Sequence, residues 1–382
     1  MPARARAGHV TGMKSVRRVD AADVIVVGGR CAGAPVAMLL ARAGLRVRLL
    51  ERARDLGDVV SGHMIKPAGA ARLRGWGLLG DLLDVPTPAI TAATLWVGGE
   101  PCPGPPLPAD QTALAPRRYV LDRLLLAAAR DAGADVRLGV TARSVLRAGE
   151  RVTGVRTSAG DHRARLVIGA DGRHSVMARA VGADWTWRRP TATYGYYTYW
   201  SGAPIDRMHA WIEPGLFAGL FPTNDGKALM FYQAPAAGFA DARLAPDARY
   251  RRVLDDRPEL RRLLAGAKIT EHLRGIGDLP TFFRRSAGLG WALIGDAGHH
   301  KDPLIARGIA DAFRDADVLA ETVTRHWDNE LDEAVAAYEL RRDRDSRPLA
   351  EANLAVAALD QPGPVLAERW RSAAALEQRL PA

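Results

Sequence analysis

The sequence predicts an α/β protein in which a doubly wound, mostly parallel sheet carries an inserted antiparallel β domain and is followed by C-terminal helices. Three observations predict this fold. A buried strand at residues 23–27 leads through a glycine turn into a helix and then a second buried strand. Alternating, tyrosine-rich segments separated by turn residues fill residues 193–232, and helical patterns occupy most of the chain after Ile309. The first pattern is typical of a doubly wound sheet, and the second of a separate antiparallel sheet.

Composition limits the class of protein. The chain has 382 residues, 48% of them hydrophobic, which is enough for one large domain or two joined ones. It has neither a membrane-spanning apolar run nor a secretory signal, so we expect a cytoplasmic protein without a membrane span. The net charge is +10, but basic and acidic residues are interspersed, which disfavours nucleic-acid binding. The two cysteines, Cys31 and Cys102, form neither a disulfide framework nor a CxxC metal pair, so no metal site is expected.

The same patterns predict a discontinuous arrangement of domains. After an excursion, an amphipathic helix at 119–132 and strands up to residue 168 return the chain to the parallel sheet. Met13 is an alternative start, because a basic stretch of small residues precedes the first strand. The expected units are a disordered basic extension at 1–20, a nucleotide-binding domain at 21–88, 112–184 and 276–345, a substrate-binding β-sheet domain at 89–111 and 185–275, and C-terminal helices at 346–382.

The glycine turn between the first strand and helix predicts a dinucleotide site. Gly28 permits a tight turn, and Gly33 lets the helix approach the strand, so that backbone N–H groups and the helix start face a pyrophosphate. Arg30 replaces the middle glycine of the GxGxxG pattern, which weakens the motif when it stands alone. Glu51 ends the second strand where a ribose-binding carboxylate is expected, although a charged strand end is the plain alternative. The predicted contacts are Gly28, Arg30, Cys31, Ala32, Gly33, Glu51 and Arg52.

Two later segments make the pattern more specific. Gly169-Ala170-Asp171-Gly172 follows a strand at 166–168, and Gly295-Asp296 follows another strand and continues through Pro303 to Gly308. Together with the glycine turn, and in this order, they resemble the group A flavoprotein monooxygenases. This is the para-hydroxybenzoate hydroxylase superfamily, which also contains geranylgeranyl reductases and flavin halogenases. The resemblance covers roughly residues 23–340 and implies an FAD-binding sheet of the GR2-type Rossmann-like class.

The resemblance also implies roles for individual residues. Glu51 would bind the FAD ribose, Asp171 would lie near the pyrophosphate, and Asp296 would hold a ribityl hydroxyl. Pro303 and Gly308 would lie along the isoalloxazine ring, and Arg118 is similar to the family's FAD-contacting arginine. The chain departs from the family where Ala310 stands in place of the usual asparagine. Backbone N–H groups around Gly308 and Ile309, at a helix start, remain available to stabilise negative charge on a reduced flavin.

Three polar residues are candidates for catalysis because the resemblance places them beside the flavin. His300 and Lys301 lie in a His-His-Lys-Asp segment, in which adjacent histidines would not converge on one metal ion. An acid–base or positioning role is the functional interpretation, and a hydrogen-bonded loop is the alternative. His63 lies in a loop that passes the flavin in the family, and for a lone histidine in such a loop a structural hydrogen bond is somewhat more typical than catalysis. Lys66 and Lys301, two of only five lysines, both fall in segments expected to border the flavin, which is a mild indication of function that chance explains almost as well.

The tyrosine-rich strand is the candidate for a substrate chamber. Alternation places Tyr197 and Tyr199 on one face and four other side chains on the opposite face. We expect that second face to form the chamber floor, and a purely structural sheet is the alternative. Residues 220–226 resemble the strand and turn that follow the substrate sheet in this superfamily, whereas the Trp-x-Trp segment at 185–187 lacks the isoleucine of the halogenase signature. The expected substrate contacts are Tyr194, Tyr196, Thr198, Trp200, Phe221 and Pro222.

The function implied by the resemblance is an FAD-dependent monooxygenase of secondary metabolism. NADPH or NADH, as a transient co-substrate, would reduce FAD, and O₂ would form a flavin 4a-hydroperoxide that hydroxylates or epoxidises an apolar or aromatic small molecule. The chain has one dinucleotide fingerprint only, which agrees with a nicotinamide cofactor that binds transiently. The alternatives are a geranylgeranyl-reductase-type enzyme acting on a prenyl or polyketide-like substrate, and a non-redox flavin-containing cyclase or binding protein. A monomer or homodimer is expected.

Overall fold

A six-stranded sheet forms the base of the molecule in the computed structural model, which describes residues 22–104 and 106–378. Neighbouring strands pair in parallel except at the β20 edge, which confirms the doubly wound α/β prediction. The predicted basic extension at 1–20, with Met13, lies outside the described residues. The strand order is β20 (Ala287–Gly288), β21 (Trp291–Leu293), β11 (Leu166–Gly169), β1 (Val24–Val27), β2 (Val47–Glu51) and β7 (Asp135–Leu138).

Both faces of this sheet are covered. On one face, buried side chains of α1 (Gly33–Arg42), α4 (Arg118–Asp131) and α9 (Gly308–Arg325) form a core with the strands. On the other face, Val152 and Val155 of a small antiparallel sheet and Met177 of α5 (Val176–Val181) pack against Val167. The small sheet consists of β8 (Ala142–Ala148), β9 (Arg151–Thr157) and β10 (Gly160–Arg163).

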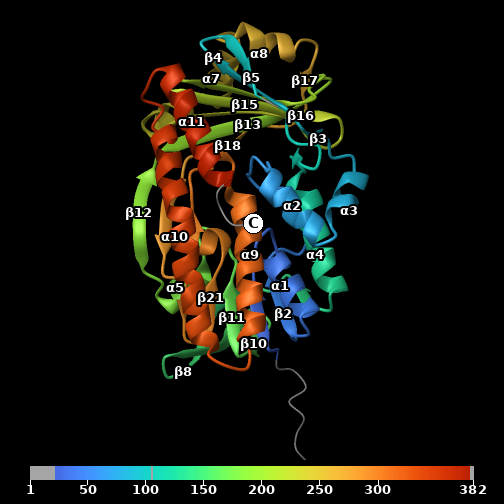
Figure 1. The fold of residues 1–382 in the computed structure, drawn as a ribbon, viewed down its shortest axis with the longest axis vertical. Helices are drawn as coiled ribbons and strands as arrows, with labels where there is room; N and C mark the ends of the chain where they lie inside the picture. The colour runs from blue at the N-terminus through green and yellow to red at the C-terminus, as the bar shows by residue number, and fades with distance from the viewer. Residues whose placement is uncertain (1–21, 105, 379–382) are drawn as a thin grey trace, which may run out of the picture.

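A second, larger sheet lies across the upper end of the molecule in Figure 1. It is antiparallel except where β14 pairs with β4. Helices α6 (Phe239–Ala242), α7 (Pro246–Asp255) and α8 (Pro258–Leu263) pack on its outer face through residues such as Tyr250 and Leu260. Its strands, in order, are β17 (Lys268–Ile269), β13 (Thr193–Ser201), β16 (Lys227–Pro235), β15 (Leu216–Pro222), β14 (Met208–Glu213), β4 (Ala93–Val97) and β5 (Glu100–Pro103), and β18 (Arg274–Ile276) also pairs with β13.

Several elements at the expected domain limits pair outside the large sheet. β12 (Trp185–Thr191) pairs with β19 (Pro280–Arg284), which in turn pairs with β22 (His299–His300). β3 (Ala89–Ile90) pairs with β6 (Ala113–Leu114). These small sheets pair segments of the chain that connect the two large sheets. The division into domains stays a prediction.

Helices complete the junction between the two large sheets. α2 (Pro67–Gly75) and α3 (Leu79–Asp84) follow the second strand of the parallel sheet, and α2 contacts α9. α10 (Leu331–Ala357) runs along α9 and crosses the expected limit at 345/346 as one helix. α11 (Gly363–Gln378) packs on α10, β4, β14 and the 3-10 helix η3 (Pro303–Ile305), as Figure 1 shows for α10 and the large sheet. No helix in 22–104 or 106–378 has the length and apolar character needed to cross a bilayer.

Candidate functional site

The glycine turn after β1 is shaped for close approach of a ligand and of neighbouring backbone. Gly28 has a φ of +103°, and a Cβ there would lie 2.4 Å from the carbonyl oxygen of Ala170. A Cβ on Gly33, the first residue of α1, would lie 1.8 Å from the carbonyl oxygen of Gly28. Only glycine fits either position without a backbone shift. The turn thus lies against the Gly-Ala-Asp-Gly segment and leads directly into the start of a helix, an arrangement that suits a pyrophosphate.

Glu51 lies at the end of β2 beside this turn. Its buried carboxylate accepts hydrogen bonds from the backbone N–H groups of Gly29, at 2.8 Å, and Ala53, at 2.9 Å. Arg52, the other residue predicted from this strand end, is exposed. The carboxylate is therefore fixed where the turn begins, as a ribose-binding group would have to be.

A buried carboxylate that the sequence analysis did not single out holds the turn from behind. The side chain of Asp122, in α4, is fully buried and accepts hydrogen bonds from Arg30 at 2.5 Å and Arg118 at 3.0 Å. The thiol of Cys31 lies 3.3 Å from the same carboxylate, and burial raises the pKa of that thiol, so it stays protonated and donates. Three predicted cofactor residues thus share one anchor. Its spacing of four residues from Arg118 on one helix was a usable signal.

The other two segments of the fingerprint converge on the same turn. Gly295 has a φ of +56°, and a Cβ there would lie 2.9 Å from the Cβ of Ala32. Asp296 beside it is partly exposed, and its carboxylate makes no hydrogen bond to any residue that the structure describes. Asp171 instead caps α5, accepting bonds from Ser175 Oγ at 2.5 Å and the Val176 N–H at 2.7 Å. Asp296 is thus free to bind a ligand hydroxyl, whereas Asp171 first of all shapes its segment.

The segment from His299 to Ile309 is expected to run along the flavin. Pro303 and Gly308 are exposed, a Cβ on Gly308 would meet no atom within 4 Å, and Ile309 is buried at the start of α9. His300 contacts the carbonyl oxygen of Pro280 through Nδ1, at 2.6 Å, and stacks on Phe282. The start of α9 at Gly308 is therefore open. The Nδ1 atom of His300 is occupied by a hydrogen bond within the protein.

Lys301 is buried in a chain of ion pairs. Its ammonium group donates to Asp311 at 2.6 Å and lies 3.2 Å from Nδ1 of His299. His299 in turn contacts Asp315 through Nε2, at 2.9 Å. The described contacts of Lys301 and His300 are those of a hydrogen-bonded loop. Their catalytic assignment stays a prediction.

The large sheet presents a different face to this region than the sequence analysis expected. Tyr194, Tyr196 and Trp200 pack in the core that α7 and α8 cover, on the outer face of the sheet. The hydroxyl of Thr198 donates to the carbonyl oxygen of Glu271 at 2.7 Å. The neighbours on the opposite face, Tyr197 and Tyr199, cluster with Met64, Ala115, Phe221 and Leu229, and Ala306 of the expected flavin loop packs against them.

This arrangement corrects the choice of face: the floor expected from Tyr194, Tyr196 and Trp200 is covered by helices, and the face toward the flavin loop carries Tyr197 and Tyr199. Phe221 lies on that inner side, as a substrate contact would have to. Pro222 ends the same strand. Alternation along the strand separated the two faces, but it did not indicate which one the helices cover.

His63 forms a hydrogen-bonded pair with Tyr199 on this inner face. Its Nδ1 lies 3.1 Å from the carbonyl oxygen of Ala115, and since a carbonyl only accepts, Nδ1 carries the proton. Nε2 therefore accepts the Tyr199 hydroxyl proton, over 2.9 Å. Burial lowers the pKa of His63 to about 3, so the ring is neutral at physiological pH. Its backbone has a φ of +36°, an unusual value for a residue with a side chain.

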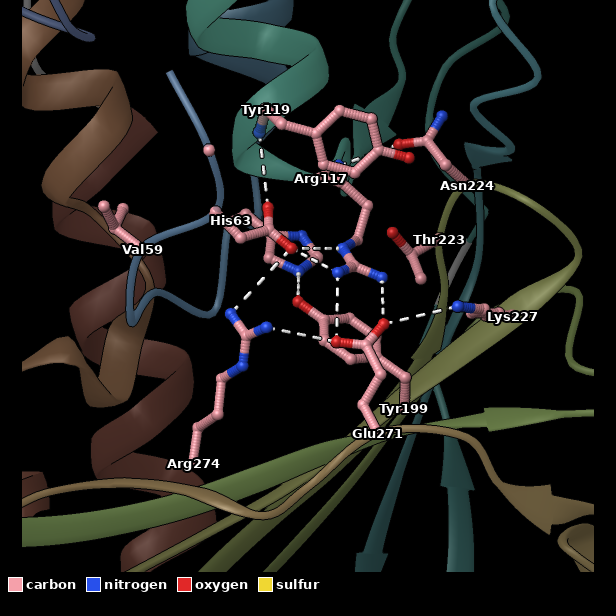
Figure 2. Close-up of polar contacts among 12 residues, drawn as sticks. Val59, His63, Arg117, Tyr119, Tyr199, Thr223, Asn224, Lys227, Glu271 and Arg274 are labelled. Atoms are coloured by element: carbon pink, nitrogen blue, oxygen red, sulfur yellow. Dashed lines mark hydrogen bonds and ion pairs between the residues drawn. The ribbon is translucent and has the colours of Figure 1, made fainter. Parts of the chain in front are cut away.

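Arg117 ties the His63 loop to the large sheet, as Figure 2 shows. Its guanidinium group donates to Asp58, in the loop before His63, and to Glu271 at 2.6 Å, and lies 3.8 Å from the centre of the Tyr199 ring. Arg274 and Lys227 add further ion pairs to Glu271, at 3.1 Å and 3.3 Å. The members of this cluster are far apart in the chain, so no local pattern in the sequence predicts it.

Comparisons with known proteins agree with this geometry. A family model described as "FAD binding domain" matches residues 21–251. A FAD-dependent urate hydroxylase from Klebsiella oxytoca is 28% identical, over 78% of this chain and 80% of the relative. A kynurenine 3-monooxygenase from Salinispora arenicola is 30% identical, over 87% of this chain and 78% of the relative. A menaquinone reductase from Mycolicibacterium smegmatis is 29% identical, over 79% and 76%.

A solved structure shares the fold over almost its full length. The flavin-dependent brominase Bmp2 superposes with a TM-score of 0.82 and covers 94% of both chains, at 17% sequence identity. At that identity the likeness shows the fold alone.

Proposed function

The chain belongs to the FAD-binding-domain family of flavoproteins, within the group A monooxygenase superfamily, and from this premise we propose that it is an NAD(P)H-dependent monooxygenase that hydroxylates or epoxidises an apolar or aromatic small molecule. The observation that carries the proposal is the convergence of three distant segments at one turn. Gly28 meets Ala170, and Gly295 meets Ala32, so that Glu51 and Asp296 lie beside the same short stretch of backbone.

The residues at this turn fit FAD. The turn and the start of α1 would bind the pyrophosphate, Glu51 the ribose, and Asp296, with its unpaired carboxylate, a ribityl hydroxyl. The open start of α9 at Gly308 would place backbone N–H groups near the flavin ring. When bound, FAD supplies the redox chemistry, accepting a hydride from NAD(P)H and reacting with O₂. The protein binds and orients it.

The inner face of the large sheet supports an apolar or aromatic substrate. Tyr197, Tyr199 and Phe221 are buried there with Met64 and Leu229. Such a surface excludes water and gives a flat ring a large contact area. The neutral His63–Tyr199 pair adds directional hydrogen bonding without adding charge. We therefore place the substrate between this face and the loop from Pro303 to Gly308.

A nicotinamide cofactor would bind transiently. The described residues contain one parallel sheet with a glycine turn of the dinucleotide-binding type. This supports NAD(P)H as a co-substrate that visits the flavin without a domain of its own. The other proposed partners are the small-molecule substrate and O₂. We propose that the protein is cytoplasmic and is a monomer or homodimer.

The proposal is tested on the purified full chain. We expect a yellow protein whose FAD spectrum bleaches anaerobically on addition of NADPH or NADH. In an oxygen electrode, candidate aromatic metabolites should stimulate O₂ uptake, and mass spectrometry should find products heavier by one oxygen atom. A flavin that neither nicotinamide reduces would contradict the proposal.

A reductase of the geranylgeranyl-reductase type is the second candidate, because the menaquinone reductase relative matches most of this chain. The two reactions need the same FAD frame and differ in the electron acceptor. Substrate-dependent NAD(P)H oxidation without O₂ uptake, giving a product with one double bond fewer, would favour the reductase.

A further inference from the structure

A carboxylate from the C-terminal helix bridges two cations at the starts of two other helices. Glu377, in the last turn of α11, accepts a hydrogen bond from Lys66 Nζ at 2.7 Å and pairs with Arg307 NH1, also at 2.7 Å. Lys66 is the N-cap residue of α2, and Arg307 is the N-cap residue of α9. No local sequence pattern joins these three residues, so tertiary packing alone brings them together.

The bridge lies at the edge of the proposed site. Arg307 stands between Ala306, which packs on the cluster of Tyr197, Tyr199 and Phe221, and the exposed Gly308. α2 contacts α9, so the starts of the two helices are neighbours. Each helix start carries partial positive charge. The carboxylate of Glu377 therefore meets the side-chain cations of the two residues that cap these helix starts.

Without Glu377, positive charge would be in excess. Arg307 also donates to Asp311 at 2.7 Å, and Asp311 is already paired with Lys301. Burial alone would raise the pKa of Asp311, but the nearby cations outweigh burial and hold it well below its usual value. Lys301 and Arg307 would then share the carboxylate of Asp311, and Lys66 would lose the carboxylate of Glu377. The other charged groups facing this cluster are Arg72 of α2, which is paired with Asp317 at 2.9 Å, and Arg314 of α9, which lies 3.8 Å from Asp315.

Arg307 has bonding capacity beyond these pairs. Its side chain is 3% exposed, and neither its Nε nor its NH1 has a hydrogen-bond partner among residues 22–104 and 106–378, so the contact of NH1 with Glu377 is an ion pair without hydrogen-bond geometry. A buried arginine is stable only while its charge is compensated, so removing Glu377 without a replacement is costly. Exchanging one carboxylate for another preserves that compensation.

We propose that Lys66, Arg307 and the starts of α2 and α9 form a carboxylate-binding site, and that Glu377 is its internal, displaceable occupant. The incoming ligand is an aromatic or apolar carboxylate whose body lies against the inner face of the large sheet. This assignment of substrate class rests on the proposed function, because that function places a substrate beside Ala306. Displacement would free the end of α11, so ligand binding and opening of the C-terminal helix are coupled.

The proposal is tested by calorimetric titration of the purified full chain with benzoate, and with benzamide as the uncharged counterpart. Glu377→Gln removes the internal competitor, whose effective concentration is on the order of millimolar or higher. We expect benzoate to bind at least about tenfold more tightly to this variant than to the wild type. The affinity for benzamide should not change.

Glu368→Gln is the matched control. Glu368 lies on the same helix, its side chain is 71% exposed, and it forms an exposed ion pair with Arg371 at 3.4 Å. This variant should bind benzoate as the wild type does. Lys66→Met in the Glu377→Gln background should abolish the gain. An unchanged benzoate affinity in Glu377→Gln, or an equal gain for benzamide, would overturn the proposal.

A conservative variant covers the case in which Glu377→Gln does not fold. Glu377→Asp keeps the charge but is shorter, so it should hold the two cations less well and give a smaller gain in benzoate affinity. No gain would again overturn the proposal. The titration uses neither NADPH nor turnover, so it separates the two ideas. If the protein is an oxygenase but Glu377→Gln does not change benzoate binding, only this inference is contradicted. If Glu377→Gln shows the gain but the protein consumes no O₂, only the proposed function is contradicted.

Discussion

Substitution of Asp122, whose carboxylate is buried, is the most stringent test of the cofactor site. This carboxylate holds Arg30, Cys31 and Arg118, and the Asp122 side chain is fully buried. Asp122→Asn keeps the shape but leaves two arginines without their negative partner. Deleting one partner of a buried pair costs about 3–5 kcal/mol. Because asparagine still offers a carbonyl acceptor and Arg30 is partly exposed, we expect a loss of about 2–4 kcal/mol in the free energy of unfolding.

The assay has two parts. Urea unfolding of the apoprotein measures stability, and quenching of flavin fluorescence measures FAD affinity, which should fall at least about tenfold as the turn loses its anchor. Asp55→Asn is the control, because Asp55 and its partner Arg123 form an exposed pair worth at most about 1 kcal/mol. If Asp122→Asn unfolds with the same midpoint as Asp55→Asn and binds FAD as tightly, the anchoring role is refuted.

Three further predictions address the turn and the inner face. Gly33→Ala places a Cβ 1.8 Å from the Gly28 carbonyl oxygen, so the variant should purify without FAD and without yellow colour. Tyr199→Phe leaves Nε2 of His63 without its donor and should cost about 1–2 kcal/mol in urea unfolding. The pKa of His63 is about 3 in the folded protein and 6.5 when unfolded, so the unfolded state binds the proton first as pH falls. Stability should therefore drop between pH 6.5 and 3, by about 2 kcal/mol at pH 5, and His63→Asn should remove this part of the pH dependence.

Features with a local signal could be predicted from the sequence. The turn from Gly28 to Gly33 follows a continuous apolar strand, and a few residues define both its shape and its place in the sheet. The strand with Tyr197 and Tyr199 also carried its alternation in the sequence. The alternation does not show which face of the strand other elements cover. In the structure, helices within residues 239–263 bury Tyr194 and Tyr196. Since both faces are rich in aromatic side chains, composition did not separate them.

Charged clusters built from distant residues left no such signal. Arg117 meets Asp58 and Glu271, which are separated from it by 59 and 154 residues, and Lys66 meets Glu377 across 311 residues. Ion pairs of this kind have no periodicity, because each needs only two side chains and a fold that brings them together. Asp122 differs. It lies four residues after Arg118 on one helix, so helical geometry alone would have paired the two.

The adjacent residues Arg117 and Arg118 show how the fold couples the two halves of the proposed site. Arg118 reaches the glycine turn through Asp122, whereas Arg117 reaches the Tyr199 ring and the loop before His63. Arg117 is the N-cap residue and Arg118 the first residue of α4, a helix whose buried face is packed against α1. A displacement of the glycine turn that tilts this helix start must therefore also move Arg117, and with it the Tyr199 side of the large sheet. Two neighbouring side chains thus connect the glycine turn and the Tyr199 face of the large sheet directly, without a long path through the core.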